Sequence, residues 1–105
     1  MKVIEAQQGF IILSQAKLDG LTTEQKYKVL NVARTLKQTS KEFEDFIKDT
    51  QEKVTDVKEQ NEILSKEAER GIEVNIEKLG DTFDKLLEAN SWNVSQAILL
   101  EDLIK

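Results

Sequence analysis

The residues that could do chemistry in this chain are its charged and hydroxyl side chains, because it contains neither histidine nor cysteine. Histidine is the commonest general base, cysteine is a strong nucleophile, and both are frequent ligands of transition metals. The serines therefore lack a histidine that could activate them, and no disulfide or zinc-thiolate site can form. We expect a protein that is not an enzyme and that binds no cofactor.

A row of basic side chains is the first charge pattern along the chain. After Lys26, the next members lie eight, eleven and fifteen positions on, so a helix would place all four on one face. This basic stripe consists of Lys26, Arg34, Lys37 and Lys41. A nucleic-acid site would use such a stripe to contact phosphates. The net charge of -5, and the lack of an aromatic residue interleaved with the stripe, favour instead a solvated face or pairing with an acidic helix.

Carboxylates follow the basic stripe at helical spacing, which raises a metal site or mimicry of nucleic acid as alternatives. The series is Glu42, Asp45, Asp49, Glu52, Asp56 and Glu59. Lys48, Lys53 and Lys58 interrupt it, and a single helix cannot surround a calcium ion with its oxygen ligands. We therefore interpret the series as solvated helix surface and expect no metal.

A seven-residue repeat predicts the element that positions both charge patterns. Its members are Val29, Leu36, Phe43, Thr50, Val57 and Leu64. Residues three and four positions later extend the same helical face, and Thr22 with Gln25 forms a capping box at its start. We predict one helix over Thr23–Arg70, about 70 Å long. A bend in Lys37–Glu42, or continuation of the helix through Gly71, are the alternatives.

The apolar face narrows along this helix, and the narrow half predicts where a partner binds. The first half is wide enough for several neighbouring helices and should hold the core, whereas the second half suits a single helix. The line in the second half consists of Val54, Val57, Asn61 and Leu64. Because the shorter helices cannot cover it, we predict that a second copy does so, in an antiparallel homodimer.

Shorter elements flank the long helix. The apolar spacing predicts helices over Ala6–Leu18 and Asn75–Ala89. Lys2–Glu5 is expected to be extended and to pair with Ser91–Leu100 in a two-stranded ribbon, although a C-terminal helix fits Ser91–Leu100 almost as well. The predicted fold is mainly α, with a long amphipathic helix in a helical hairpin or coiled coil, and residues 1–105 form a single helical domain.

Charge and hydropathy also bear on location. Residues 1–41 contain 7 basic and 3 acidic side chains, whereas residues 42–105 contain 8 basic and 17 acidic ones, so the chain is an electrostatic dipole. The apolar run Gly9–Leu13 is too short for a signal sequence or a membrane span. We expect a cytoplasmic protein with no membrane partner.

Four amphipathic segments give the chain a resemblance to a known family. They are Tyr27–Arg34, Phe43–Phe46, Phe83–Glu88 and Val94–Leu100, the last followed by Glu101, Asp102 and Leu103. In the order of these segments, the sequence resembles a family of small phage and prophage proteins of uncharacterised function. The resemblance implies a phage origin and the host cytoplasm as location, and it supplies no catalytic residues.

These patterns predict a non-enzymatic interaction protein, such as an assembly or accessory factor, that acts through a helical surface. Its expected partners are a second copy in a homodimer and another phage or host protein. The alternative is a regulatory protein that binds nucleic acid or blocks a host enzyme.

Overall fold

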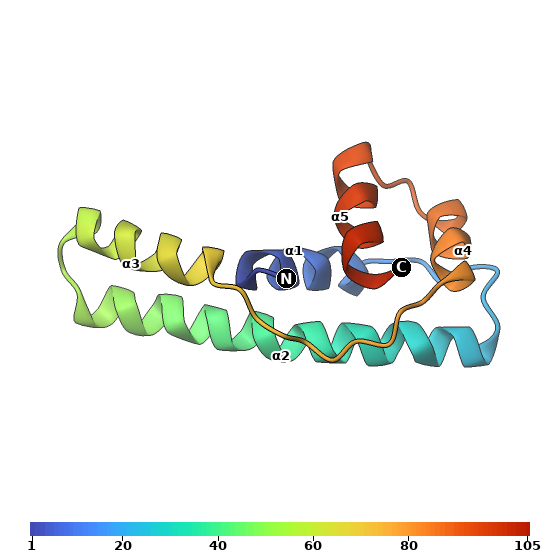
Figure 1. Ribbon diagram of the computed structural model, residues 1–105, viewed down its shortest axis with the longest axis horizontal. Coiled ribbons are helices and arrows are strands. Elements are labelled where there is room, and N and C mark those ends of the chain that lie inside the picture. Colours follow the sequence, from blue (N-terminus) through green and yellow to red (C-terminus); the bar gives the residue numbers. More distant parts are fainter.

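The structure, a computed structural model that describes residues 1–105, contains five helices and no strand beyond one isolated bridge, so the predicted mainly α fold is confirmed. The helices are α1 (Val3–Ser14), α2 (Thr23–Lys53), α3 (Val57–Glu69), α4 (Asp81–Ala89) and α5 (Val94–Ile104). Helix α2 runs along the 49 Å long axis of the molecule (Figure 1). Helices α1 and α3 follow each other along α2, α5 stands against the second part of α1, and α4 lies farther towards the end where α2 begins.

The prediction of one helix over Thr23–Arg70 is wrong, because α2 ends at Lys53. The chain turns at Val54–Asp56, and α3 packs back against α2 as an antiparallel hairpin (Figure 1). The helical region does end just before Gly71, but the interruption inside it does not lie in Lys37–Glu42. The hairpin gives the second half of α2 a partner from its own chain.

Local chemistry explains this turn. Val54 and Thr55 are β-branched and have low helix propensity, and Val54 is extended, with φ -113° and ψ 115°. The Asp56 carboxylate then accepts hydrogen bonds from the backbone N–H groups of Lys58 (2.9 Å) and Glu59 (3.1 Å). This side chain satisfies donors that the start of a helix leaves free, so a new helix begins here.

Helix α1 begins and ends earlier than the predicted Ala6–Leu18, and its start is fastened to the end of α3. Lys2 forms the isolated antiparallel bridge with Gly71. The Lys2 ammonium also contacts the Glu69 carboxylate at 2.6 Å. This hydrogen bond, together with the negative charge of Glu69, raises the pKa of Lys2 above its ordinary value.

The loop after α1 is fixed by Asn90, which follows the last residue of α4. The side-chain oxygen of Asn90 accepts a hydrogen bond from the Lys17 N–H (2.7 Å). Its side-chain nitrogen donates to the carbonyls of Lys17 (3.0 Å) and Leu86 (2.9 Å). The turn that follows contains Gly20 at φ 82°, where a side chain would be strained. The Asn90 amide thus connects the loop between α1 and α2 to α4.

The predicted helix Asn75–Ala89 is wrong in its first part, because α4 begins only at Asp81. Residues 72–79 form no helix: Ile72, Val74 and Ile76 are partly buried, while the residues between them are exposed. Such alternation is the pattern of an extended segment. The same residues also show helical spacing, but the structure adopts the extended alternative.

The end of the extended segment satisfies the last carbonyls of α5. The Lys78 ammonium donates to the Leu103 carbonyl (2.8 Å), and the Leu79 N–H donates to the Ile104 carbonyl (2.7 Å). Gly80 then turns the chain into α4 with φ 55°, a conformation that favours glycine. The helix end therefore has hydrogen-bond donors from a distant part of the sequence, as a helix end requires.

No two-stranded ribbon joins the termini, because most of Lys2–Glu5 belongs to α1 and residues 94–104 are helix α5. Asn93 and Gln96 form a capping box: the Gln96 N–H donates to the Asn93 side chain (2.8 Å), and the Asn93 N–H donates to the Gln96 side chain (3.1 Å). A strand over Ser91–Leu100 depends on alternating apolar residues, but Gln96 breaks this alternation and is part of a helix start. The alternative prediction of a C-terminal helix is confirmed.

The core lies at one end of the molecule. It consists of Ala6, Leu13, Leu21, Val29, Val32, Leu36, Leu79, Phe83, Leu86, Leu100, Leu103 and Ile104. From α2 it includes residues only as far as Leu36, which confirms that the first half of the predicted long helix holds the core. Gly9 lets α1 approach its neighbours closely, since a Cβ atom there would lie 3.0 Å from Leu103 Cδ1 and 3.4 Å from Leu36 Cδ1.

Candidate interaction surface

Two helices of this protein carry no charge over most of their length. No charged residue occurs between Glu5 and Lys17 or between Glu88 and Glu101, although 33% of the residues in the chain are charged. These stretches form most of α1 and the first part of α5. A helix that is apolar all round is normally buried on all sides. Here both helices retain exposed apolar side chains.

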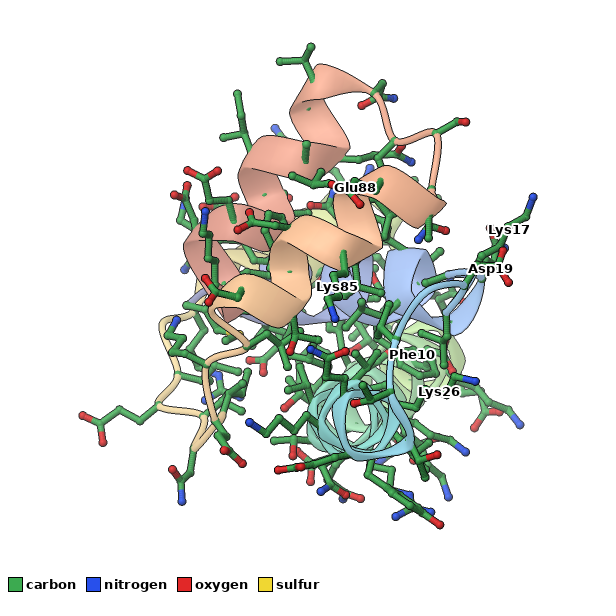
Figure 2. All side chains as sticks on the ribbon, turned by 90° about the vertical axis from the view of Figure 1, so that its right-hand side faces the viewer. Phe10, Lys17, Asp19, Lys26, Lys85 and Glu88 are labelled. Carbon is green, nitrogen blue, oxygen red and sulfur yellow. The ribbon has the colours of Figure 1, made fainter.

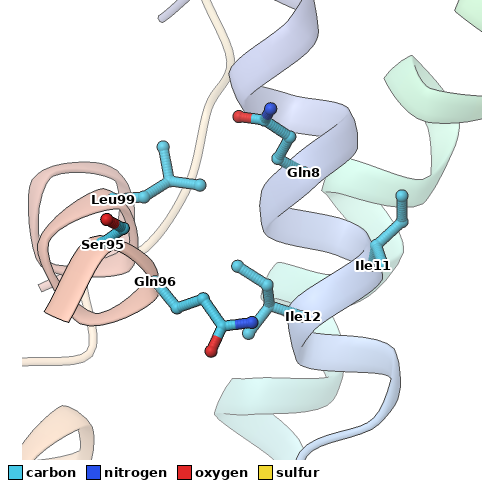
Figure 3. A pocket seen from close by; sticks show the side chains of 6 residues that line it. All are labelled: Gln8, Ile11, Ile12, Ser95, Gln96 and Leu99. Atoms are coloured by element: carbon cyan, nitrogen blue, oxygen red, sulfur yellow. The ribbon is translucent and has the colours of Figure 1, made fainter. Parts of the chain in front are cut away.

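The exposed sides of the two helices meet in a groove of about 370 Å³ (Figure 3). It is lined by Gln8, Ile11, Ile12, Ser95, Gln96 and Leu99. On the adjacent side of α5, outside the groove itself, Val94 is 76% exposed and Ile98 is 56% exposed. We call this groove, together with Val94 and Ile98, the α1–α5 surface. Exposed apolar side chains gathered in this way are typical of protein interaction sites.

Two amides supply polar groups to the α1–α5 surface. The side-chain oxygen of Gln96 is used in the capping box, and the nitrogen of the same amide points across the groove towards Ile12 (Figure 3). Gln8 lies on the opposite wall, on α1. Amide groups of this kind can donate to the backbone of a bound protein, but they are not general acids or bases. The surface therefore offers both apolar contacts and hydrogen-bond donors to a bound partner.

A second groove, of about 420 Å³, lies on another flank of α1, against α2. Its apolar lining includes Phe10, Leu13, Leu18, Val29, Leu30 and Ala33. Arg34 and Lys37 complete the lining on the α2 side. Figure 2 views the molecule from the end where α2 begins and shows Phe10 and Lys26 on the same side. We call this site the α1–α2 groove.

The structure brings the basic stripe together on exposed surface of α2, next to the α1–α2 groove. All four side chains are exposed, and none forms an ion pair within the chain. Tyr27 is also exposed and lies seven residues before Arg34, on the same helical face. One exposed aromatic residue therefore lies beside the basic stripe.

The hairpin separates the residues of the predicted oligomer interface. Val54 lies in the turn, while Val57 and Asn61 belong to an open, mostly charged and polar face of α3. Leu64 is partly buried. These residues no longer form a line along one helix, and α3 now occupies the place along α2 that a second copy was expected to fill. An interface at these four positions stays a prediction. The reason for it, an uncovered apolar line along one continuous helix, no longer holds.

The remaining charged groups form no site. No group of three or more acidic side chains lies close enough together to hold a metal ion. The pKa of Arg70 is raised by its hydrogen bond to the Glu67 carboxylate (2.9 Å), but this pair is distant in sequence from both grooves.

None of the five helices combines the length and the hydropathy needed to span a membrane.

The sequence-based search missed the α1–α5 surface, although a signal for it was present. That search looked for apolar stripes, and a helix that is apolar all round shows no stripe. The signal is the lack of charge over residues 6–16 and 89–100. Two uncharged segments so far apart in the sequence indicate a surface only once the fold has placed them side by side.

Comparisons with known proteins add no indication of function. No protein-family model matches the chain, and no curated protein and no solved structure matches it either. Any function must therefore be argued from the geometry of the two grooves.

Proposed function

We propose that this protein is a non-enzymatic interaction protein, an assembly or accessory factor, whose partner binds to the α1–α5 surface. The observation that supports this is the gathering of exposed apolar side chains on two uncharged helices, in a chain with 33% charged residues. The cores of protein interfaces are depleted of charge in the same way. The resemblance to small phage proteins agrees with this role and would locate it in the host cytoplasm.

The partner that we propose for this surface is a second copy. Each copy has a net charge of -5, so two copies repel each other wherever their acidic parts meet. The α1–α5 surface is uncharged, and a two-fold dimer would bring it against itself. Ile11, Val94 and Ile98 would then be covered without the burial of any charge. This arrangement replaces the antiparallel dimer that was predicted along Val54, Val57, Asn61 and Leu64.

Light scattering at tens of micromolar tests the dimer. We expect wild type to be a dimer and Ile98→Asp to be a monomer, because a carboxylate buried without a partner is costly. Val57→Asp is the matched control, since Val57 is 67% exposed, but on α3. This control should remain a dimer. Dissociation of Val57→Asp, with Ile98→Asp still dimeric, would contradict the proposal and favour an interface on α3.

A regulatory protein that binds nucleic acid or blocks a host enzyme is the competing function. The exposed basic stripe with Tyr27 beside it favours this alternative, because basic and aromatic side chains together can bind phosphates and stack on bases. A gel shift with single-stranded and duplex DNA tests it. A shift that disappears when Arg34 and Lys37 are both changed to Glu would favour the regulator. Gene neighbourhood also discriminates, because phage structural genes and host-takeover genes usually lie in different operons.

A further inference from the structure

The α1–α2 groove differs from the α1–α5 surface because it is apolar inside and basic at its edge. Phe10 and Leu13 line it from α1, and Leu30, which is exposed, lines it from α2. Arg34 and Lys37 lie along the α2 side, and Lys26 and Lys41 continue the basic stripe in both directions. A ligand that fills this groove must therefore combine apolar and anionic groups.

The spacing of the basic stripe makes an external anion favourable. Arg34 and Lys37 are three positions apart and Lys37 and Lys41 are four apart, so like charges are neighbours on the helix and destabilise it. Farther along α2, the chain uses opposite charges at this spacing, as in the Asp49–Lys53 ion pair (3.1 Å). No carboxylate of the chain lies within ion-pair distance of the stripe. An anionic ligand bound beside the stripe would relieve the repulsion between its basic side chains.

We propose that the α1–α2 groove binds an amphipathic helix with an acidic flank, presented by a partner protein. The apolar side chains of this helix enter the groove, and its carboxylates face Arg34 and Lys37. Recognition of a helix in a groove commonly uses apolar anchors three or four residues apart. From Lys26 to Lys41 the stripe extends about 22 Å along α2, which matches a partner helix of about fifteen residues.

Other occupants match the groove less well. Nucleic acid would place its charged backbone over a groove whose lining is mainly hydrocarbon, on a protein of net charge -5. The outward face of α3 on a second copy carries Lys58, Glu62 and Lys66 and has only Val57 as an apolar residue, so it offers neither a net acidic flank nor an apolar row. The proposal adds a second partner to the protein, and it can fail without affecting the dimer through the α1–α5 surface.

A labelled synthetic peptide tests the proposal on the full chain. The probe is a helical peptide of about sixteen residues with Leu on one face and Glu beside it, and the comparison peptide has Lys in place of Glu. Fluorescence anisotropy should show the Glu peptide binding at least about tenfold more tightly, with an affinity that falls as salt is raised. Equal binding of the two peptides would overturn the proposal.

Variants locate the binding. Changing Arg34 and Lys37 together to Glu, or Leu30 to Asp, should abolish binding of the Glu peptide. The matched control changes two exposed lysines of α3, Lys58 and Lys66, to Glu, which alters the net charge equally and should keep most of the binding. Circular dichroism checks that each variant is folded. Equal losses in the control, or single-stranded DNA that displaces the Glu peptide, would overturn the proposal. Conversion of a wild-type dimer to monomer by the Arg34 and Lys37 changes would also overturn it, by identifying a second copy as the occupant.

Discussion

Along its first half, helix α2 packs against α1, with α4 and α5 at the same end of the molecule, and along its second half it packs against α3. Helices α1, α4 and α5 share a core with α2, and Lys85 of α4 also donates a hydrogen bond to Gln25 at the start of α2 (3.1 Å). Helix α3 has no buried residue at all. We call these two parts the core end and the hairpin arm. The two parts differ in packing. They also differ in charge, because most of α1 and α5 is uncharged whereas α3 is mostly charged and polar.

The comparison shows that an uncovered apolar surface need not lie where packing is poorest. Helix α3 has a narrow apolar line and charges elsewhere, so a single neighbour is enough to cover it. Helices α1 and α5 are apolar nearly all round, and their neighbours cover only part of that area. The candidate interaction surface therefore lies at the well-packed end. It results from an excess of apolar side chains and not from a lack of structure.

Truncation of a buried side chain should show the largest difference in stability between the core end and the hairpin arm. Phe83 is fully buried and stacks on Trp92, with ring centroids 6.2 Å apart, so Phe83→Ala should lower the free energy of unfolding by about 3–5 kcal/mol. In the hairpin arm, Ile63→Ala should cost only about 1 kcal/mol, because Ile63 is partly exposed. Urea unfolding measures both. Equal losses would mean that the arm is packed as well as the core end.

Loss of the amide that connects the α1–α2 loop to α4 should have the next largest effect. Asn90→Ala removes three hydrogen bonds and should lower the free energy of unfolding by about 2 kcal/mol. Asn61→Ala, on the exposed side of α3, removes none and should cause no loss. Thermal unfolding of the two variants provides the comparison. If they melt together, the Asn90 hydrogen bonds add nothing to the core end.

A gain in stability is expected from a substitution at Ser40, which lies in α2 between the core end and the hairpin arm. The Ser40 hydroxyl is buried in α2 beyond Leu36 and has no hydrogen-bond partner. Ser40→Ala should therefore raise the free energy of unfolding by about 1 kcal/mol, because it removes a desolvated hydroxyl and improves helix propensity. Ser65→Ala, which is exposed on α3, should gain only about half as much. A destabilised Ser40→Ala would show that this hydroxyl does have a favourable interaction.

The smallest expected effect concerns the ion pair that joins the arm to α1. Folding raises the pKa of Lys2, so the stabilisation by its contact with Glu69 is complete below the pKa of this lysine in the unfolded chain and is lost as pH rises through the higher pKa of the folded state. Wild type should be slightly more stable than Lys2→Met at neutral pH and equal to it at strongly alkaline pH. Urea midpoints of the two proteins across this range measure the difference. A difference that persists when Lys2 is deprotonated would exclude the charge as its cause.

Much of the fold was predictable from periodicity, and two of the errors occur where a capping residue decides the structure. Asp56 followed by Glu59 is a helix-start signal, but the seven-residue repeat continued across it and concealed the turn. Asn93 and Gln96 were likewise hidden by an apparent alternation. In both cases a local hydrogen bond prevailed over a hydrophobic pattern that fitted two structures.

The candidate sites were predictable only in part. The basic stripe lies on one exposed helical face, as its spacing indicated, because that inference depends on α2 alone. The groove beside the stripe needs Phe10 and Leu13 from α1. The α1–α5 surface needs α1 and α5 side by side. No periodicity within one segment contains that information, because it depends on which segments the fold brings together.

The close contact of Gly9 with Leu103 has a consequence for how the protein is made. These residues lie at opposite ends of the sequence, and ribosomes add about 5–20 residues per second. Helix α1 therefore leaves the ribosome several seconds before α5 exists. During that interval the apolar side of α1 that α5 will cover is open to chaperones and to neighbouring nascent chains.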